Sequence, residues 1–512
     1  MITTQLLNNL FSFQTLVGLA VGVLGGMLIG ALPGLGATMG VALLIPLTYG
    51  MAPTGALIML TALYTSAIYG GSITAILIHT PGTPASAATA ADGYALTLQG
   101  KGLSALGAST ICSMLGGTVS AIALLCIAPP LARLSLSFSA AEYFLIALFG
   151  LTIIGSLAGD NMVKGILSGV FGLALGLVGY DIVYGMARYT YRITALESGI
   201  QLVPALIGLF SISQVMVQAE KIGTQQANYD ASMAARGKFF PGWKEFFRWI
   251  PNIIRSTIIG IIVGILPGAG GDVSSWVSYN EAKRFSKNRK LFGKGSIDGV
   301  CASETANNAV TGGALIPLLT LGIPGSSTAA VLLGGLLLQG LVPGHGLFTQ
   351  NADITYAIIL GFMFANILMG FIGMLIAKHV AKVANVSSGI LAPIIVVLSV
   401  VGAYAINMSI VDVVVMIIFG FIGYWMRKYG FATAPVVLGI LLGPMAENGY
   451  VRAQLMAKGE NMVSYYMSRP ICIVLGFLII LGLLAPFFMS RMQKKIAASS
   501  LAETGADTNS DD

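Results

Sequence analysis

The chain is built from long apolar segments that are interrupted by short polar stretches or by glycine and proline. No Asp, Glu, Lys or Arg occurs before Asp92, and a second stretch without these residues extends from Thr305 to Ala352. Each stretch is far longer than the roughly 20 residues that one helix needs to cross a bilayer. We therefore predict that each contains several crossing or re-entrant helices.

The apolar segments form two series on either side of a polar, aromatic-rich linker. We predict an all-α polytopic membrane protein with about 11 to 13 membrane elements. Residues 1–217 are expected to form a first transmembrane repeat, 218–250 the linker loop and 251–490 a second transmembrane repeat. The end of the chain, 491–512, is basic and then acidic, and we expect a disordered tail there.

One phrase, Gly-x-Leu-Pro-Gly-x-Gly, occurs in both series, at Gly30–Gly36 and at Gly264–Gly270. Proline removes a backbone donor and glycine favours non-helical backbone, so each copy should break a membrane helix. Non-helical backbone at membrane depth persists only where it is buried in protein or lines a wet cavity. Paired breaks in two halves of a chain therefore indicate the binding site of a transporter.

The duplication continues beyond this phrase. Each half contains a Gly-Gly pair, then a Pro-Gly turn, then a Gln-Gly pair. In the first half these are Gly70-Gly71, Pro81-Gly82 and Gln99-Gly100, and in the second half Gly312-Gly313, Pro324-Gly325 and Gln339-Gly340. We expect two structural repeats in inverted orientation, although the pattern alone leaves parallel repeats open. The second half has nine more residues between its two prolines, which we assign to the basic loop around Lys283–Lys294.

The interrupted segment 252–280 has basic loops on both sides. Short basic loops usually face the cytoplasm, so the segment is expected to enter and leave on one face as a re-entrant hairpin. Each arm of about 14 residues would reach roughly 21 Å, which passes the bilayer centre but not the far side. A discontinuous spanning helix is the alternative.

Composition agrees with a membrane protein, because only 9% of the residues are charged, 56% are hydrophobic and the mean hydropathy is +0.85. The net charge is +7, and the basic residues lie mainly in loops between the apolar segments. We therefore do not interpret this charge as a sign of nucleic-acid binding. The four cysteines lack C-x-x-C spacing, so we expect buried apolar thiols and no metal site. The apolar N-terminus lacks a basic beginning and is interpreted as a retained helix.

Taken in order, the motifs resemble the TctA family, the large membrane subunit of tripartite tricarboxylate transporters. They comprise the two Leu-Pro-Gly-x-Gly breaks, His79-Thr80-Pro81-Gly82-Thr83-Pro84, Asp92-Gly93-Tyr94, Gly179-Tyr180-Asp181 and Gly322-Ile323-Pro324-Gly325. The resemblance covers roughly residues 10 to 490. One departure is Gln214, where relatives often carry an acidic residue, and this puts the role of a carboxylate there in doubt.

The resemblance implies a permease of the bacterial inner membrane that works with a periplasmic solute-binding protein and a small, TctB-like membrane subunit. It implies uptake of citrate or another di- or tricarboxylate by symport, driven by an ion gradient. No cofactor is expected apart from Na⁺ or H⁺ as the coupling ion.

A carboxylate inside a bilayer must be met by donors, and the motifs contain no Arg or Lys. Backbone N–H groups at half-helix N-termini and nearby hydroxyls are therefore the expected donors, although an ordinary helix cap is the alternative for each hydroxyl. The candidate substrate-binding residues are Gly34, Gly36, Thr80, Gly82, Thr83, Ser86, Gly268, Gly270, Gly325, Ser326, Ser327 and Thr328.

Exposed carbonyls and intramembrane acids suit a cation, and acids in this setting usually face a cavity, a partner or a proton path. The candidate ion-coupling residues are Thr38, Asp272, Glu304, Asn307 and Asn308. Asp272 has the alternative of capping the arm that follows it, and Glu304 that of an interfacial acid. His79 is interpreted as a hydrogen-bonded packing residue, with a proton carrier as the alternative. Tyr64 is expected to pack between helices or to face lipid.

Two other functional classes share some of these sequence features. A stand-alone secondary carboxylate carrier or a channel would use the same hairpins, so the sequence leaves it open. An intramembrane aspartyl protease would pair Tyr180-Asp181 with Asp272, but Ala269 replaces the first glycine that such enzymes require, and the duplication has no explanation. His-Glu-x-x-His and Gly-x-Ser-x-Gly motifs do not occur, so we do not expect an enzyme.

Overall fold

A computed structural model describes residues 3–32, 35–152, 162–181, 185–220, 239–240, 242–266, 270–380 and 388–481. By its contacts the chain forms two compact units, unit 1 with Met1–Ser137 and Thr190–Tyr429, and unit 2 with Phe138–Tyr189 and Gly430–Asp512. The predicted boundaries at 217, 250 and 490 stay predictions. The tail 491–512 and most of the linker lie outside the described residues.

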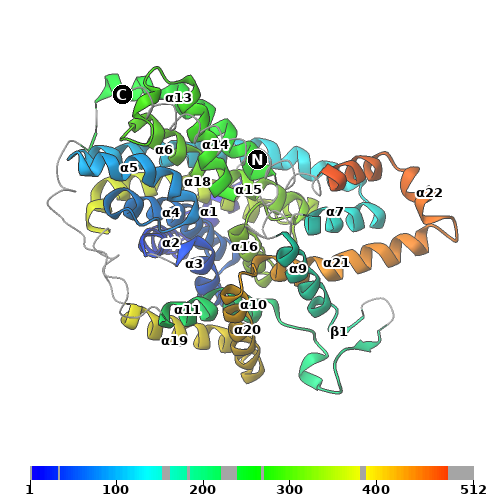
Figure 1. The fold of residues 1–512 in the computed structure, drawn as a ribbon. Helices are drawn as coiled ribbons and strands as arrows, with labels where there is room; N and C mark the ends of the chain where they lie inside the picture. The colour runs from blue at the N-terminus through cyan, green and yellow to red at the C-terminus, as the bar shows by residue number, and fades with distance from the viewer. Residues whose placement is uncertain are drawn as a thin grey trace, which may run out of the picture. The chain divides into compact units, whose positions relative to one another are not determined.

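The first half of unit 1 consists of helices and short 3₁₀ turns (Figure 1). They are α1 (Thr4–Leu10), α2 (Phe13–Ala31), α3 (Gly36–Leu44), η1 (Pro46–Thr48), α4 (Pro53–Ile78), η2 (Pro84–Ser86), α5 (Ala87–Leu98), α6 (Gly102–Leu134) and η3 (Ser135–Ser137).

The rest of unit 1 begins with η4 (Thr194–Leu196) and a helix with a π-helical centre, made of α10 (Leu202–Leu206), η5 (Ile207–Ile212) and α11 (Ser213–Glu220). The second half follows with α13 (Trp243–Ile265), α14 (Gly270–Phe285), η6 (Arg289–Leu291), α15 (Ile297–Leu321), α16 (Ser327–Leu338), α17 (His345–Thr349), α18 (Ala352–Val380), α19 (Ser388–Asn407) and α20 (Ile410–Lys428).

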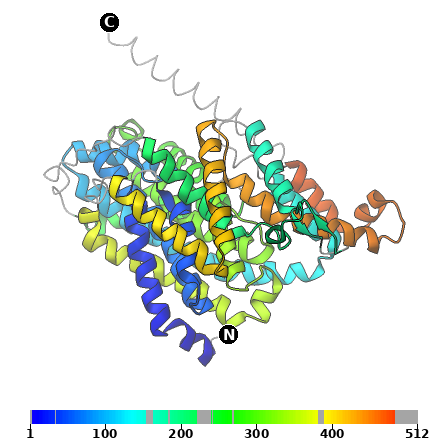
Figure 2. The same cartoon turned by 90° about the horizontal axis from the view of Figure 1, so that it is seen from below.

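The segment that carries the first Leu-Pro-Gly break is a helical hairpin. Helices α2 and α4 pack side by side and run parallel, because Gly18, Gly22, Gly26 and Gly30 meet Gly55, Met59, Leu63 and Ala67 in the same order (Figures 1 and 2). Glycine permits this close approach of two backbones. The chain must therefore return between them, and Gly40 of α3 packs against Ile29 of α2 on the way back.

The second break forms a hairpin of the same kind. Helix α13 runs parallel to α15, since Gly260 and Gly264 meet Ala306 and Val310. Helix α14 runs in the opposite direction, since the Ser274 hydroxyl donates to Ala306 O and that of Ser278 donates to Ala302 O. Helices α13 and α14 therefore form a hairpin and not a discontinuous spanning helix.

The two hairpins repeat the same packing residue by residue. Gly26 and Gly30 meet Leu63, Ser66 and Ala67, and the corresponding glycines, Gly260 and Gly264, meet Ala306, Ala309 and Val310. The offset between matching residues is 234 in the first helix of each half and 243 in the third. The nine additional residues thus lie between α13 and α15, in the region where the sequence placed them.

The third helices of the two halves, α4 and α15, run in opposite directions. Thr65 of α4 contacts Asn308, whereas Ser72, two turns later, contacts Glu304, which precedes Asn308. Equivalent helices that are antiparallel belong to inverted repeats, as expected. The all-α membrane fold is also confirmed, because eight described helices are long and apolar enough to cross a membrane.

Unit 2 consists of α7 (Ala140–Thr152), α9 (Met162–Gly176), β1 (Gly179–Tyr180), β2 (Ala187–Arg188), α21 (Ala434–Met456), α22 (Met462–Met467) and the apolar helix Pro470–Leu481. The two strands pair antiparallel, with Gly179 opposite Arg188. Helix α21 packs against both α7 and α9.

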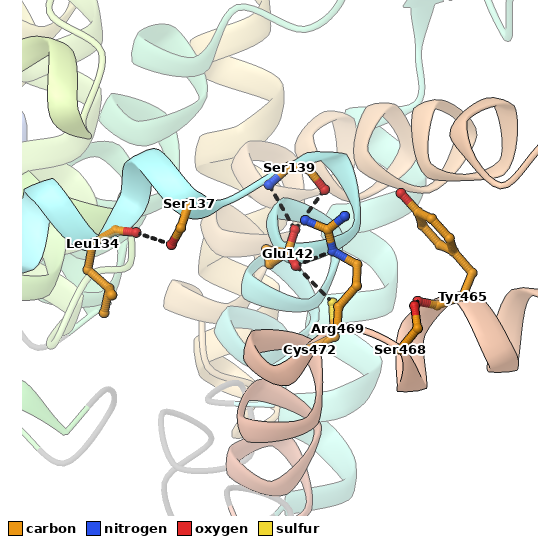
Figure 3. Close-up of polar contacts among 8 residues, drawn as sticks. All are labelled: Leu134, Ser137, Ser139, Glu142, Tyr465, Ser468, Arg469 and Cys472. Atoms are coloured by element: carbon orange, nitrogen blue, oxygen red, sulfur yellow. Dashed lines mark hydrogen bonds and ion pairs between the residues drawn. The ribbon is translucent and has the colours of Figure 1, made fainter.

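Ion pairs hold parts of unit 2 together. Glu142 is 1% exposed and accepts hydrogen bonds from Arg469 Nε (2.6 Å), from the backbone N–H and hydroxyl of Ser139, and from the Cys472 thiol (Figure 3). Arg188 donates to Glu447 through its two terminal guanidinium nitrogens, Nη1 and Nη2. The cysteines are free, and Cys126 is exposed, so the expectation that all four are buried was wrong for that residue. Its place on α6, a long helix with one outward face, explains the difference.

Candidate functional site

The breaks of each half lie against one another. In the first half, Gly82 donates its N–H to Gly71 O (3.1 Å), and a Cβ atom on Gly82 would lie 1.9 Å from Gly30 O. In the second half, a Cβ atom on Gly325 would lie 2.4 Å from Gly264 O. Only glycine fits at these two contacts, so the Pro-Gly turn of each half is seated on the first arm of its own hairpin.

The return arm of each hairpin also reaches the turn of the other half. Thr38 of α3 and Thr328 of α16 share a hydrogen bond of 2.8 Å between their hydroxyls. On the other side, Gly271 of α14 lies next to Ala85 in η2. The described residues beside the four interruptions thus meet around α4 and α15, and we call this place the junction.

Hydroxyl groups at this junction are mostly engaged with the protein. The Ser326 hydroxyl accepts from Ala329 N–H as the N-cap of α16 and lies 3.0 Å from the hydroxyl of Tyr64. Thr83 and Ser86 form a capping box at the start of η2. The capping alternative thus describes their local role. Tyr64, which was expected to pack between helices or to face lipid, joins the site because the two halves cross there.

Asn307 and Asn308 are fully buried in α15. Asn308 donates to the carbonyl (3.2 Å) and hydroxyl (3.1 Å) oxygens of Thr65. Neither the oxygen nor the nitrogen of the Asn307 amide has a hydrogen-bond partner among the described residues, and this amide lies beside Gly271 near the hairpin tip. A buried amide without partners is costly in a finished core, so its place at the junction indicates a ligand position.

Glu304 lies one turn before these amides and is also fully buried. Its Oε1 accepts hydrogen bonds from the hydroxyls of Ser72 (2.6 Å) and Thr89, and its Oε2 accepts from Ser109 and Ser113 (3.0 Å each). None of these four hydroxyls is among the residues predicted from the sequence. The spacing of Ser109 and Ser113, one helical turn apart in an apolar helix, was the available signal.

The other candidates have different surroundings. Gly36 and Gly270 have left-handed backbone (φ 55° and 63°) at the first residues of α3 and α14. Asp272 is exposed and lies in the first turn of α14, where a carboxylate is favourable beside the positive end of the helix. The Thr80 hydroxyl donates to Ile78 O of its own segment. Ser327 is half-buried on the first turn of α16, and Gly34 and Gly268 lie outside the described residues.

The duplicated Gln-Gly pair and the Asp92-Gly93-Tyr94 motif hold loops in place. The Gln99 amide donates to Lys294 O (2.7 Å), and that of Gln339 donates to Thr48 O (3.1 Å), so each Gln-Gly pair anchors a loop of the other half. Oδ1 of Asp92 accepts the backbone N–H groups of Gly293, Gly295 and Ser296 at 2.8–2.9 Å.

Gln214, the departure from the family pattern, lies in α11 and accepts a hydrogen bond from Arg427 (2.9 Å). The Ser213 hydroxyl also accepts from Arg427 (3.0 Å), so the partners that bind this guanidinium here are neutral.

Comparisons with known proteins agree with this architecture. The family model of the tripartite tricarboxylate transporter TctA family matches residues 16–438. A protein of Agrobacterium vitis described as an uncharacterized 52.8 kDa protein in the TAR-I ttuC' 3'region is 36% identical over 480 residues, which are 93% of this chain and 94% of that protein. An uncharacterized protein in the TAR-II ttuC' 3'region of the same organism is 34% identical over 235 residues, 45% of this chain and 96% of that protein.

No solved structure matches the chain. The family match covers both hairpins, both Pro-Gly turns and the third helices that cross between the halves. The chain therefore belongs to the TctA family of tripartite tricarboxylate transporters.

Proposed function

We propose that this multi-pass membrane protein is the large permease subunit of a binding-protein-dependent transporter that takes up a small di- or tricarboxylate across the bacterial inner membrane. The periplasmic solute-binding protein and the small membrane subunit are part of this proposal, as is an ion gradient that drives symport. Family membership supports the transport class, and the junction of the four breaks supports the location of the substrate site.

The observation on which this location of the substrate site rests is a contact between the two halves. The Thr38 hydroxyl, in the return arm of the first hairpin, shares a hydrogen bond with the Thr328 hydroxyl, which follows the Pro-Gly turn of the second half. Transporters built from inverted repeats bind substrate where broken helices of the two repeats meet. The polar groups there are hydroxyls, amides and helix N-termini without a lysine or arginine among the candidate residues. Such donors suit an anion that must be released again, because neutral dipoles bind it less tightly than a fixed cation.

The test uses hydroxyl-to-methyl exchanges that preserve side-chain volume. We expect Thr38→Val and Thr328→Val to raise the Kd for radiolabelled citrate or succinate, measured on the purified chain in detergent, by about tenfold, as befits one lost hydrogen bond to a charged group. Thr257→Val is the matched control, because the buried Thr257 hydroxyl donates to Ile253 O in its own helix (2.8 Å).

Each variant is first compared with the wild type by gel filtration, so that a folding defect is not read as lost binding. Unchanged Kd values in both Thr38→Val and Thr328→Val, or an equal loss in Thr257→Val, would refute the assignment of the site. Failure of the wild-type chain to bind any of a panel of di- and tricarboxylates would refute the substrate class.

A further inference from the structure

The packing that the two repeats share does not require an acidic residue at Glu304. The matched contacts of the two hairpins make Leu63 equivalent to Ala306, and the same register makes Thr61 equivalent to Glu304. Thr61 is buried like Glu304, and its hydroxyl donates to Leu57 O of its own helix (2.8 Å). A threonine is therefore sufficient at this place in the fold, and the second half carries a carboxyl group there instead.

Glu304 has no basic partner among the residues that the structure describes. On the neighbouring α13, Arg248 pairs with Asp298 and Arg255 lies over the ring of Phe285, while Lys244 is exposed in the first turn. Several titratable groups lie on the helices packed around it. They are Tyr64 and Tyr69 on α4, Asp92 and Tyr94 on α5, Cys112, Cys126 and Arg133 on α6, Asp272, Tyr279, Glu281, Lys283 and Arg284 on α14, and Asp298 and Cys301 on α15.

A fully buried carboxylate without a cation is expensive, and such groups take up a proton or a metal ion. The hydroxyl oxygens of Ser72, Ser109 and Ser113 lie 2.6 to 3.0 Å from the carboxylate oxygens, and the Thr89 hydroxyl also donates to the carboxylate, so the cluster closes on itself through hydrogen bonds. Thr89 extends it to the Ser303 hydroxyl (2.9 Å), which donates to Gly299 O. This closed arrangement suits a proton better than a metal ion, which would have to separate these oxygens.

We propose that Glu304 is a proton-binding site and that its carboxyl group carries one proton in the conformation seen here. The proton adds to one carboxylate oxygen and is shared with a neighbouring hydroxyl, which turns to accept it. When the helices move so that water reaches Glu304, the proton leaves to water and the carboxylate is hydrated. No other bond forms or breaks.

The position of the cluster explains how a proton is linked to the substrate site. The hydroxyl donors come from α4, α5 and α6, whereas Glu304 belongs to α15 of the other half. Asn307 and Asn308 follow on the same helix, about one turn closer to the junction. Proton release would weaken the contact between the halves and shift α15 together with these amides. This coupling step rests on the proposed function, whereas proton binding by Glu304 does not.

The test follows the protonated-carboxyl stretching band of the purified full-length chain by infrared spectroscopy during a pH titration in choline buffer. We expect the wild type to show this band at neutral pH and Glu304→Gln to lack it. Glu281→Gln, which removes an acid outside the cluster on α14, should retain the band.

A second variant keeps the test decisive if Glu304→Gln does not fold. Ser109→Ala combined with Ser113→Ala removes both donors to Oε2, so the band should persist to a pH about one unit higher than in the wild type. A band identical in the wild type and Glu304→Gln, or a band abolished by Na⁺ at constant pH, would overturn the proposal. Citrate binding by the wild type judges the proposed function separately, because the band is measured without substrate.

Discussion

A single methyl group at the tip of the first hairpin tests the packing on which the site depends. A Cβ atom on Gly30 would lie 2.1 Å from Ala67 O and 2.7 Å from the carbonyl carbon of the same residue. These are backbone atoms of α4, which cannot rotate away as a side-chain end would. Nonbonded carbon contacts are comfortable at about 3.5 Å or more, so Gly30→Ala must push α2 and α4 apart by about 1 Å.

The magnitude follows from two opposing effects. Alanine stabilises a helix by about 1 kcal/mol relative to glycine. Overpacking of a well-packed interior typically costs about 1–3 kcal/mol, and contact with backbone places Gly30 at the upper end of that range. The net change in the free energy of unfolding is a loss of about 2 kcal/mol. Gly25→Ala in the same helix meets no atom within 4 Å and should gain up to about 1 kcal/mol.

The assay is the thermal unfolding midpoint of each purified variant in one detergent, read from the fraction that remains monodisperse after heating. We expect the midpoint of Gly30→Ala to fall below that of the wild type and that of Gly25→Ala to equal or exceed it. A midpoint for Gly30→Ala at or above that of Gly25→Ala would contradict the parallel packing of α2 and α4, and with it the hairpin.

Two further predictions concern stability. Asp92→Ala should lower the unfolding midpoint more than Asp92→Asn, because Oδ1 accepts three backbone N–H groups and Asn keeps one acceptor oxygen. The free energy of unfolding is expected to fall by about 2–4 kcal/mol for Asp92→Ala. Equal midpoints for the two variants would show that these contacts do not hold the loop. In unit 2, a double-mutant cycle of Arg188→Met and Glu447→Gln should give a coupling energy of at most about 1 kcal/mol, because the two side chains are 30% and 26% exposed. A coupling energy above about 2 kcal/mol would require an ion pair that is less exposed to water than the structure shows.

The sequence determined the features that depend on composition and local backbone chemistry. The absence of charge before Asp92 dictated membrane helices, and the prolines and glycines of the two repeated phrases dictated where helices end. The basic loops around 252–280 correctly indicated a hairpin, and the extra residues of the second half lie where the sequence placed them. These signals are local, since a helix break or a membrane span is written in consecutive residues.

Only the tertiary structure decided which residues meet. The bond of Thr38 to Thr328 joins positions 290 residues apart, and the four hydroxyls around Glu304 come from three different helices. Serines and threonines are common in membrane helices, so their type alone does not distinguish a cap from a ligand or from a partner of a buried acid. That distinction depends on the inverted crossing of α4 and α15, which brings distant side chains together at one depth and which no local pattern encodes.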